Sequence, residues 1–446
     1  MITYSIIQKS KLEGSHRLDA EYYQPEYLEL DKKIKRFENY LLGNLIISFA
    51  SGKNLPQADF CNSNIFFIRT QNVRPVLIDK DGMTCVDTYV KKYPSLKEGD
   101  ILTVRVGEGV GNTSIATPEF EGHSYSDNVI RFRIKNIDPY FLIVFLNSKY
   151  GYDYLERVSK GSARPLISSE NIHSIRVPNL GKEVAKFCKE QILEATTEIQ
   201  KSESLYSQAE NLLLEELGLK NYKIDEELSC VVNFSEAKSV RRIDAEYFQP
   251  KYEKIISKIK KQKAKMLGDL VSLKKGIEPG ADEYQNEGKL FIRVSNLSKQ
   301  GLVDKDQKYL SDTLYNEIRK NYEPKQNEIL LTKDATPGIA YVLKEPVEGI
   351  IAGGIVRLKV KEDIEPEYIA LCINSLIGQM QIERDAGGSI IVHLKPEQIK
   401  SLKIPILIKS VQQKIADLVH KSHESHKKAK ELLSEAKMKV EKNIGM

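Results

Sequence analysis

Three groups of side chains in this sequence could carry chemistry by their type and spacing. Gly107-Glu-Gly-Val-Gly111 is similar to a glycine loop that cradles phosphates. Asp282 with Glu287-Gly-Lys289 has the residue types of a nuclease carboxylate cluster. The histidines of His420-Lys-Ser-His-Glu-Ser-His426 are possible metal ligands.

None of the three groups has the spacing that its chemistry requires. The glycine loop lacks the dinucleotide spacing and no long helix follows it, so a turn is favoured. Histidines three residues apart drift around a helix, which favours solvated or packed side chains over ligands. The sequence contains neither an Asn-Pro-Pro-Tyr-like methyltransferase motif nor a Gly-x-x-x-x-Gly-Lys-Ser/Thr loop. We expect no catalytic residue, no metal and no cofactor.

The composition is that of a folded globular protein. Of the 446 residues, 41% are apolar and 29% are charged. The longest apolar runs, such as the one from Tyr140 to Leu146, are far shorter than the roughly 18 residues that span a membrane. The first residues lack the basic start and apolar core of a targeting segment, so the expected compartment is the cytoplasm. Five cysteines without a close pair predict neither disulfides nor a thiolate metal site. The net charge of +5 is compatible with nucleic acid but is weak support for it.

The elements that would position any site occur twice. Arg17-Leu-Asp-Ala-Glu-Tyr-Tyr-Gln-Pro25 returns 225 positions later as Arg242-Ile-Asp-Ala-Glu-Tyr-Phe-Gln-Pro250. Nearly the same shift relates Phe67-Ile-Arg69 to Phe291-Ile-Arg293. So few changes of shift over so long an interval indicate a duplicated unit.

Each copy has the pattern of a mixed α/β domain. Pro25 and Pro250 suit the first turn of a helix. Short β-rich runs at 65–68, 101–104 and 129–134 follow, and then a helix from Pro139 to Asn147. The second copy repeats them at 290–292, 329–331 and 355–360, with a helix at 366–375.

After each domain the apolar period changes to that of a coiled coil. Small and large residues alternate at spacings of three and four from Ile192 to Leu213, and again from Val419 to Val440. We therefore expect two antiparallel helices that pack on each other, with large residues opposite small ones. The predicted fold is α+β: two mixed α/β domains (1–181 and 219–408) in a pseudo-two-fold arrangement, separated by two long helices (182–218 and 409–446). A helix of about 36 residues would be roughly 54 Å long.

This organisation resembles the specificity subunit of type I restriction-modification systems. The resemblance covers nearly the whole chain and includes Gly99-Asp-Ile-Leu-Thr-Val-Arg-Val-Gly107 and Asn327-Glu-Ile-Leu-Leu-Thr-Lys333. It also includes an Asn-Ser after the middle helix and an Ile-x-x-Ile-x-Val/Ile-Pro ending at Pro178 and Pro405. Lys333-Asp-Ala-Thr departs from the Arg-x-Gly form of the first copy.

The resemblance implies a DNA-recognition subunit without catalysis of its own. In the family each domain reads one part of a split, asymmetric DNA site, two methyltransferase subunits dock on the helices, and restriction subunits can join them. Two other classes stay open: a self-contained nuclease or methyltransferase, and a coiled-coil protein scaffold.

The duplication separates shared roles from individual ones. Residues identical in both copies, such as Asn72 and Asn296, serve a common framework, phosphate contact or partner surface. Polar loop residues that differ are better candidates for reading different bases. These candidates are Gln71, Arg74, Arg105, Asn112, Thr113 and Arg164 in the first copy, and Ser295, Lys333, Asp334, Thr336 and His393 in the second.

The repeated aromatic pairs are candidates for partner binding. They are Tyr22 with Tyr23, and Tyr247 with Phe248. If the surface formed by these repeated stretches is the interface, they would be aromatic anchors for one methyltransferase subunit at each copy. The alternative is that these rings only pack the helix base against its domain.

Overall fold

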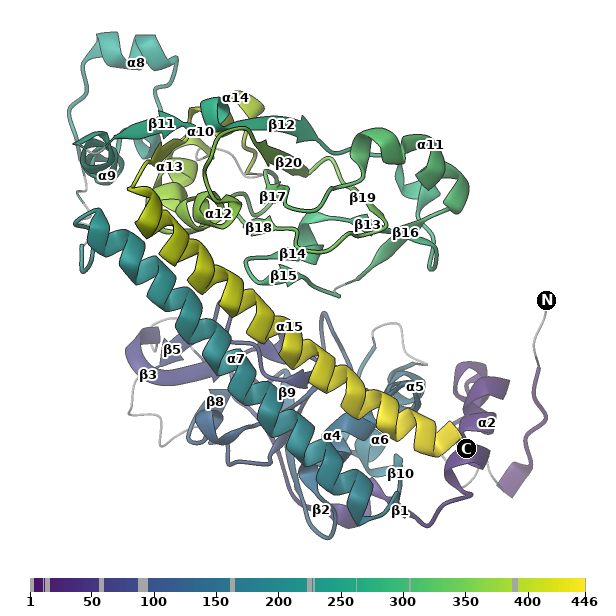
Figure 1. The fold of residues 1–446 in the computed structure, drawn as a ribbon. Coiled ribbons are helices and arrows are strands. Elements are labelled where there is room, and N and C mark those ends of the chain that lie inside the picture. The colour runs from purple at the N-terminus through teal and green to yellow at the C-terminus, as the bar shows by residue number, and fades with distance from the viewer. Residues whose placement is uncertain are drawn as a thin grey trace. The chain divides into compact units, whose positions relative to one another are not determined.

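The computed structural model describes residues 4–10, 12, 17–55, 60–86, 95–160, 165–222, 227, 229–261, 263–304, 306–386 and 392–445. The chain divides into two compact units: unit 1 is Met1–Glu198 with Lys428–Met446, and unit 2 is Ile199–Lys427. Each unit joins an α/β domain to parts of the same two long helices, α7 (Lys182–Glu216) and α15 (Lys409–Gly445) (Figure 1). The mixed α/β content predicted for each half is confirmed.

The described residues of unit 1 form three sheets. The largest has the order β2 (Ile46–Ser51), β9 (Val129–Ile134), β6 (Ile101–Val104), β7 (Thr113–Ile115) and β4 (Val76–Leu77). The second has the order β5 (Thr84–Val86), β3 (Phe60–Ile68) and β8 (Ser124–Tyr125), and the third pairs β1 (Asn39–Leu41) with β10 (Arg176–Pro178). Pairing is antiparallel except for β4 with β7 and β3 with β8.

The central strand β6 is buried on both faces, which explains its continuous apolar run. Because successive side chains of a strand point to opposite faces, Ile101 enters one apolar cluster while Leu102 and Val104 enter another. The first cluster also holds the helix α4 (Pro139–Asn147), in which every side chain from Tyr140 to Leu146 is buried. Asp138 caps α4 by accepting a hydrogen bond from the Tyr140 N–H at 2.8 Å.

The other helices of unit 1 are shorter. They are η1 (Ala20–Tyr23), α2 (Pro25–Ile34), α3 (Leu42–Leu45), η3 (Thr70–Asn72), η5 (Pro118–Phe120), α5 (Lys149–Ser159) and α6 (Ser169–His173). Pro25 stands at the first position of α2, as predicted. The helix stops at Ile34, because the chain then enters β1, which pairs with β10.

The sheets of unit 2 are similar but not identical to those of unit 1. The main one has the order β12 (Val271–Lys275), β20 (Ile355–Val360), β17 (Ile329–Thr332) and β18 (Ala340–Val342). The second has the order β16 (Lys308–Leu310), β13 (Lys289–Ile292) and β19 (Gly349–Ile351). Two further pairs are β11 (Ala264–Met266) with β21 (Lys403–Pro405), and β14 (Leu297–Ser298) with β15 (Gly301–Leu302).

The helices of unit 2 include several that the sequence did not predict. One of them is α11 (Asp312–Tyr322), whose first turn is capped by Ser311. The others are α8 (Phe234–Val240), η6 (Ala245–Phe248), α9 (Pro250–Lys261), α10 (Leu267–Leu270), η7 (Ala281–Glu283), η8 (Val294–Asn296), α12 (Pro366–Asn374), α13 (Leu376–Ala386) and α14 (Pro396–Ser401).

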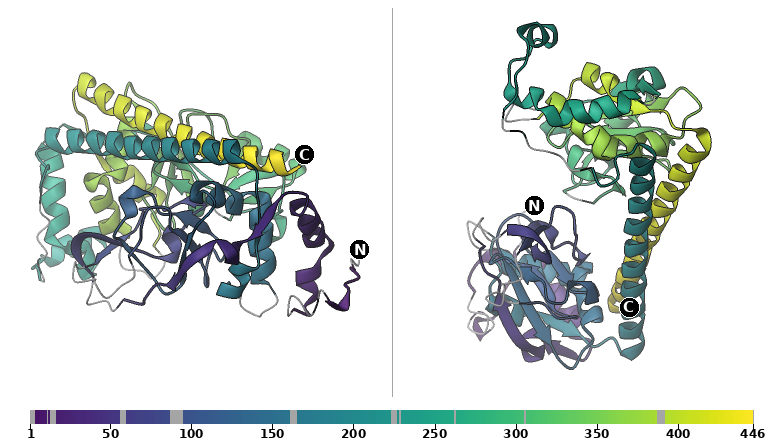
Figure 2. Two further views of the ribbon diagram at one scale, coloured as in Figure 1. Left: turned by 90° about the horizontal axis from the view of Figure 1, so that it is seen from below. Right: turned by 90° about the vertical axis from the view of Figure 1, so that its left-hand side faces the viewer.

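The long helices α7 and α15 lie side by side in every view (Figure 1, Figure 2). In unit 1 the first half of α7 shares a core with the last half of α15, through Ile192 and Val440. In unit 2 the last half of α7 shares a core with the first half of α15, through Leu213 and Val419. The pair is therefore antiparallel, and its predicted packing is confirmed.

One detail of the predicted seam is wrong. Ser202 and Ser422 face each other in unit 2, so that small meets small where large was expected opposite small. Both are buried, their hydroxyl oxygens are 3.0 Å apart, and the Ser422 hydroxyl donates to the Ser202 carbonyl at 2.8 Å. Backbones approach this closely only where neither side chain extends past Oγ. At the end of α7, Gly218 (φ 63°) closes the helix as predicted, and the Leu219 N–H donates to the Leu214 carbonyl at 2.7 Å.

Among the described residues, no helix combines the length and the apolar character that crossing a membrane requires.

Candidate nucleic-acid interface

Two of the residues predicted to read DNA directly follow the strands β6 and β17. In unit 1, Arg105 follows β6; its N–H donates to the Asn128 carbonyl at 3.0 Å and its carbonyl accepts from the Ile167 N–H at 3.0 Å. Hydrogen bonds to two neighbouring segments therefore fix the position of the Arg105 backbone, and with it the point from which the side chain extends.

Unit 2 holds Lys333 in the same way after β17. Its N–H donates to the Gly354 carbonyl at 2.9 Å and its carbonyl accepts from the Leu394 N–H at 2.8 Å. Arg105 and Lys333 are therefore structural equivalents, although the sequences of the two loops differ.

The loop after Arg105 is a tight turn. It is closed by two hydrogen bonds of 3.0 Å, from the Val104 N–H to the Asn112 carbonyl and from the Gly111 N–H to the Val104 carbonyl. Gly107, Gly109 and Gly111 have φ angles of 102°, 78° and 92°, which only glycine adopts readily. A strand, β7, follows the loop, so the interpretation as a turn holds and a nucleotide loop at a helix start is not formed.

Arg105 is half-buried and its Nε is enclosed. Within the part of the chain that the structure describes, this Nε has no hydrogen-bond partner. Because this nitrogen is shielded from solvent, an external acceptor would be reached by the accessible part of this half-buried side chain. Phosphate oxygens and the guanine edge are acceptors of this kind.

Asn112 and Thr113 have different positions despite being neighbours. Asn112 is half-buried, and a Cβ at Gly109 would lie 2.7 Å from its amide nitrogen, so the loop is shaped around this side chain. Thr113 is fully buried in β7, where its hydroxyl donates to the Gly111 carbonyl at 2.9 Å. The prediction that Thr113 contacts DNA is therefore corrected, because its side chain has no access to solvent.

The remaining candidates of unit 1 are Gln71, Arg74 and Arg164. Gln71 is exposed in η3, where its amide donates to the Gly82 carbonyl at 3.4 Å. Arg74 is half-buried, with its Nε 3.8 Å from a carboxylate oxygen of Asp79. Burial raises the pKa of that carboxyl. Arg164 lies outside the described residues, as do the repeated Gly-Ser pairs at 161–162 and 388–389.

Lys333 of unit 2 is neutralised internally. Its ammonium group lies 2.5 Å from one carboxylate oxygen of Asp334, and His393 Nδ1 lies 2.8 Å from the other. Burial opposes ionisation of Asp334, but the hydrogen bonds from His393 and Lys333 prevail and lower its pKa. Arg105 and Lys333 are therefore equivalent in position but differ in charge. The Nε of Arg105 has no hydrogen-bond partner among the described residues, whereas the positive charge of Lys333 is neutralised by Asp334, which also contacts His393.

Thr336 and Ser295 are both exposed. Thr336 belongs to the loop after β17, in which Ala335 has a left-handed φ of 59° and the Thr336 carbonyl accepts from the Thr332 hydroxyl at 2.6 Å. Ser295 belongs to η8, beside the buried Asn296. Both hydroxyl groups are accessible to a ligand.

Of the three roles left open for residues identical in both copies, the contacts of two buried asparagines favour the framework role. Asn72 accepts from the Arg69 N–H at 3.0 Å, and Asn296 accepts from the Arg293 N–H at 3.1 Å. Asn72 therefore stabilises the turn that carries Gln71, and Asn296 stabilises the turn that carries Ser295.

The repeated aromatic stretch makes the same set of contacts in each unit. We call this set the clasp: an Arg–Asp ion pair beside a tyrosine ring that packs against two arginines. In unit 1, Arg17 pairs with Asp19 at 2.6 Å and donates to the Lys160 carbonyl at 2.7 Å, while Tyr22 packs against Arg17 and Arg157 with ring-to-cation distances of 4.9 and 4.1 Å. The two arginines hold the ring from within the unit.

In unit 2, Arg242 pairs with Asp244 at 2.6 Å and donates to the Asp385 carbonyl at 2.9 Å. Tyr247 packs against Arg242 and Arg384 at 4.7 and 5.1 Å. Arg157 and Arg384 were not predicted, although their separation of 227 positions matches the shift of the duplication.

These contacts bear on the predicted partner-binding aromatics. Tyr23 is buried, and its hydroxyl donates to the Arg17 carbonyl at 3.0 Å, so its predicted role as an exposed anchor is corrected. Tyr22, Tyr247 and Phe248 are half-buried. Their contacts within each unit agree with the alternative that the rings pack the helix base.

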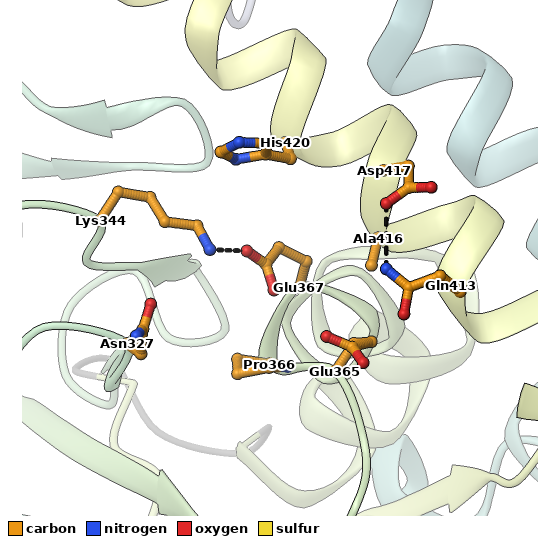
Figure 3. A pocket seen from close by; sticks show the side chains of 9 residues that line it. All are labelled: Asn327, Lys344, Glu365, Pro366, Glu367, Gln413, Ala416, Asp417 and His420. Carbon is orange, nitrogen blue, oxygen red and sulfur yellow. Dashed lines mark hydrogen bonds and ion pairs between the residues drawn. The ribbon is translucent and has the colours of Figure 1, made fainter.

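A cavity of about 350 Å³ in unit 2 has the wrong charge for DNA (Figure 3). Glu365, Glu367 and Asp417 line it, and Lys344 forms an ion pair with Glu367. Burial lowers the pKa of Lys344. Carboxylates would repel phosphates, so the cavity lies outside the interface.

Neither the carboxylate cluster nor the histidines form a metal site. Within the described ranges, no three His, Cys, Asp or Glu residues are grouped so that they could hold a metal ion. His423 is buried and its Nε2 lies 3.1 Å from the Lys299 carbonyl, and burial lowers its pKa to about 4. Lys289 pairs with Glu348 at 2.6 Å instead of completing a nuclease site.

Residues 259–435 match the family model described as the type I restriction modification DNA specificity domain. The match covers these residues of the second half of the chain. Unit 2 supplies most of this specificity domain, including Lys333, Asp334 and His393. The resemblance found in the sequence is thereby confirmed for the matched residues.

Solved structures of specificity subunits are similar over most of the chain. The type I restriction-modification S subunit from M. genitalium shares 12% identity, with 92% of this chain and 95% of that chain covered and a TM-score of 0.43. The HsdS subunit from Thermoanaerobacter tengcongensis shares 10% identity, with 92% and 96% covered and a TM-score of 0.30. No curated protein is similar enough to this chain to be matched with it.

Proposed function

We propose that this chain is the DNA-specificity subunit of a type I restriction-modification complex, in which each unit reads one half of a split, asymmetric site. The observation that carries the proposal is the match of residues 259–435 to the DNA specificity domain. The same role is proposed for unit 1, because its ion pair between Arg17 and Asp19 repeats the pair between Arg242 and Asp244 in unit 2.

The asymmetry of the site follows from the chemistry at the two strand ends. The half-buried guanidinium of Arg105 would favour a phosphate or the two acceptors of guanine. Lys333, which is held by Asp334 and His393, would instead present donors together with a carboxylate acceptor. Two loops on one framework with different polar groups would read different bases.

The chain itself performs no catalytic step in this proposal. Two methyltransferase subunits bind to it and act on the DNA that it selects, and restriction subunits can join them. The purified chain alone should neither cleave nor methylate DNA. Activity of the isolated chain would favour the self-contained enzyme, and sequence-independent or absent DNA binding by the reconstituted complex would favour the scaffold.

The decisive experiment exchanges one domain. Residues 41–178 are replaced by the corresponding domain of a relative with a known site, and methylated positions are mapped in cells that also express the methyltransferase subunit. One half-site should change and the other should stay. A change in both half-sites would contradict independent reading by the two units.

A further inference from the structure

A short turn in unit 1 links the ends of two strands. The turn comprises residues 126–129, between β8 and β9, and a hydrogen bond of 3.0 Å between its two end residues closes it. The N–H of its first residue, Ser126, donates to the Ile68 carbonyl at the end of β3 at 2.9 Å. The carbonyl of its third residue, Asn128, accepts from the N–H of Arg105, directly after β6, at 3.0 Å. The turn is therefore fixed beside Arg105.

Unit 2 has the same turn with the same contacts. It comprises residues 352–355, between β19 and β20, and is closed by a hydrogen bond of 2.9 Å. The Ala352 N–H donates to the Ile292 carbonyl at the end of β13 at 2.8 Å, and the Gly354 carbonyl accepts from the Lys333 N–H at 2.9 Å. Gly354 is therefore the structural equivalent of Asn128.

The two turns differ in what their third residue presents. Asn128 is exposed, and its side-chain amide makes no hydrogen bond with any other described residue. Gly354 is buried, and a Cβ added to it would lie 2.8 Å from Val294 Cγ2 and 3.6 Å from the Asp334 Oδ2. Neighbouring side chains thus cover this position in unit 2, whereas in unit 1 it carries an accessible polar side chain.

The chemistry of the exposed turn suits the edge of a base. The Asn128 amide holds a donor and an acceptor side by side, which complements the N7 acceptor and the N6 amino donor of adenine in the major groove. Asp127, the residue before it, is also exposed, and its carboxylate would repel phosphate oxygens. The turn is therefore better suited to base edges than to the DNA backbone.

We propose that Asn128 is a specificity-determining residue of unit 1, whose side-chain amide reads an adenine of the half-site beside the position that Arg105 contacts. The inference rests on the proposed function and deepens it, because it names a base and the group that reads it. In unit 2, Asp334 borders the equivalent space and Gly354 has no side chain to offer. The two half-sites therefore differ at this base pair.

The test uses the complex of the full-length chain with its methyltransferase subunit. The site is mapped by methylome sequencing, and affinity is then measured for duplexes of that site and of all its single-base variants. Asn128→Ala and Asn128→Gly should lose about 5- to 160-fold of discrimination at one A·T pair of the unit 1 half-site. Glycine is compatible with this turn, because Gly354 occupies the same position in unit 2. Asn128→Asp keeps only acceptors and should shift the preference there from adenine toward cytosine.

Asn136 provides a matched control in the same unit. It is exposed like Asn128, but it follows the C-terminal end of β9, whose six residues span about 20 Å. Its φ of 69° suits glycine, so Asn136→Gly should keep the fold. This variant should keep the wild-type affinity and the wild-type preference at every base pair.

The outcomes separate this inference from the proposed function. If the wild-type complex prefers no base sequence, the proposed function is wrong. If the wild-type complex is selective but Asn128→Ala and Asn128→Gly keep every base preference, the role of Asn128 is wrong. An equal loss of affinity on all sequences, or lost discrimination at a G·C pair, would also overturn it. Because the Asn128 side chain is exposed, melting temperatures of its variants should equal that of the wild-type chain.

Discussion

Replacing Arg105 with alanine should relax recognition of one base in the half-site read by unit 1. Within the described residues the Arg105 Nε has no hydrogen-bond partner, in contrast to the ammonium group of Lys333, which is paired with Asp334. A bidentate contact with guanine discriminates by about 1–3 kcal/mol, which corresponds to about 5- to 160-fold in affinity. Lys333→Ala in unit 2 should have a smaller effect, because Lys333 must first leave Asp334.

The assay is equilibrium binding of the reconstituted complex to its mapped site and to single-base variants of that site at one salt concentration. Arg105→Lys keeps the charge but loses the planar fork, so it should behave like Arg105→Ala if the contact is to a base. An equal loss on every sequence, restored by lysine, would show a phosphate contact instead. Unchanged affinity in both variants would refute the placement of Arg105 in the interface.

Three further predictions concern buried or paired groups of unit 2. Asp334→Asn should release Lys333 for phosphate contact and make the slope of log affinity against log salt more negative by roughly 0.9; an unchanged slope would contradict the pairing. Ser422→Leu should lower the free energy of unfolding by about 1–3 kcal/mol, because the larger side chain overpacks against Ser202. Ser422→Ala should lower it by only about 1 kcal/mol, through loss of the hydrogen bond to the Ser202 carbonyl. Equal effects of the two variants in denaturant titrations would argue against the close approach of the two helices at these serines. Burial lowers the pKa of His423 from its ordinary value of 6.5 to about 4 in the folded chain, so the unfolded chain binds the extra proton and stability should fall as pH drops from about 6.5 toward 4. The loss should be about 1.4 kcal/mol per pH unit at most, and His423→Gln should remove this component from unfolding free energies measured between pH 7 and 5.

Local and periodic signals were sufficient to predict much of the fold from the sequence. The 225-residue shift identified the duplication, and it remains visible in paired contacts such as Arg17 with Asp19 and Arg242 with Asp244. The spacing of three and four predicted the helix pair, because that spacing places one apolar seam along a helix. Pro25 and Gly218 marked helix ends correctly, because each restricts or frees the backbone at its own position.

The tertiary structure decided which polar residues are available to a ligand. Asn112 and Thr113 are adjacent, yet only Thr113 is buried, since β7 lies inside the main sheet. Lys333 is neutralised with the help of His393, 60 positions away, and Tyr22 is enclosed by Arg157 from another helix. Burial and charge pairing depend on segments that are distant in sequence, and no local pattern records which segments meet. The periodicity of this chain therefore predicts its elements and its duplication, while the chemistry of each recognition loop is set by the neighbours that folding brings to it.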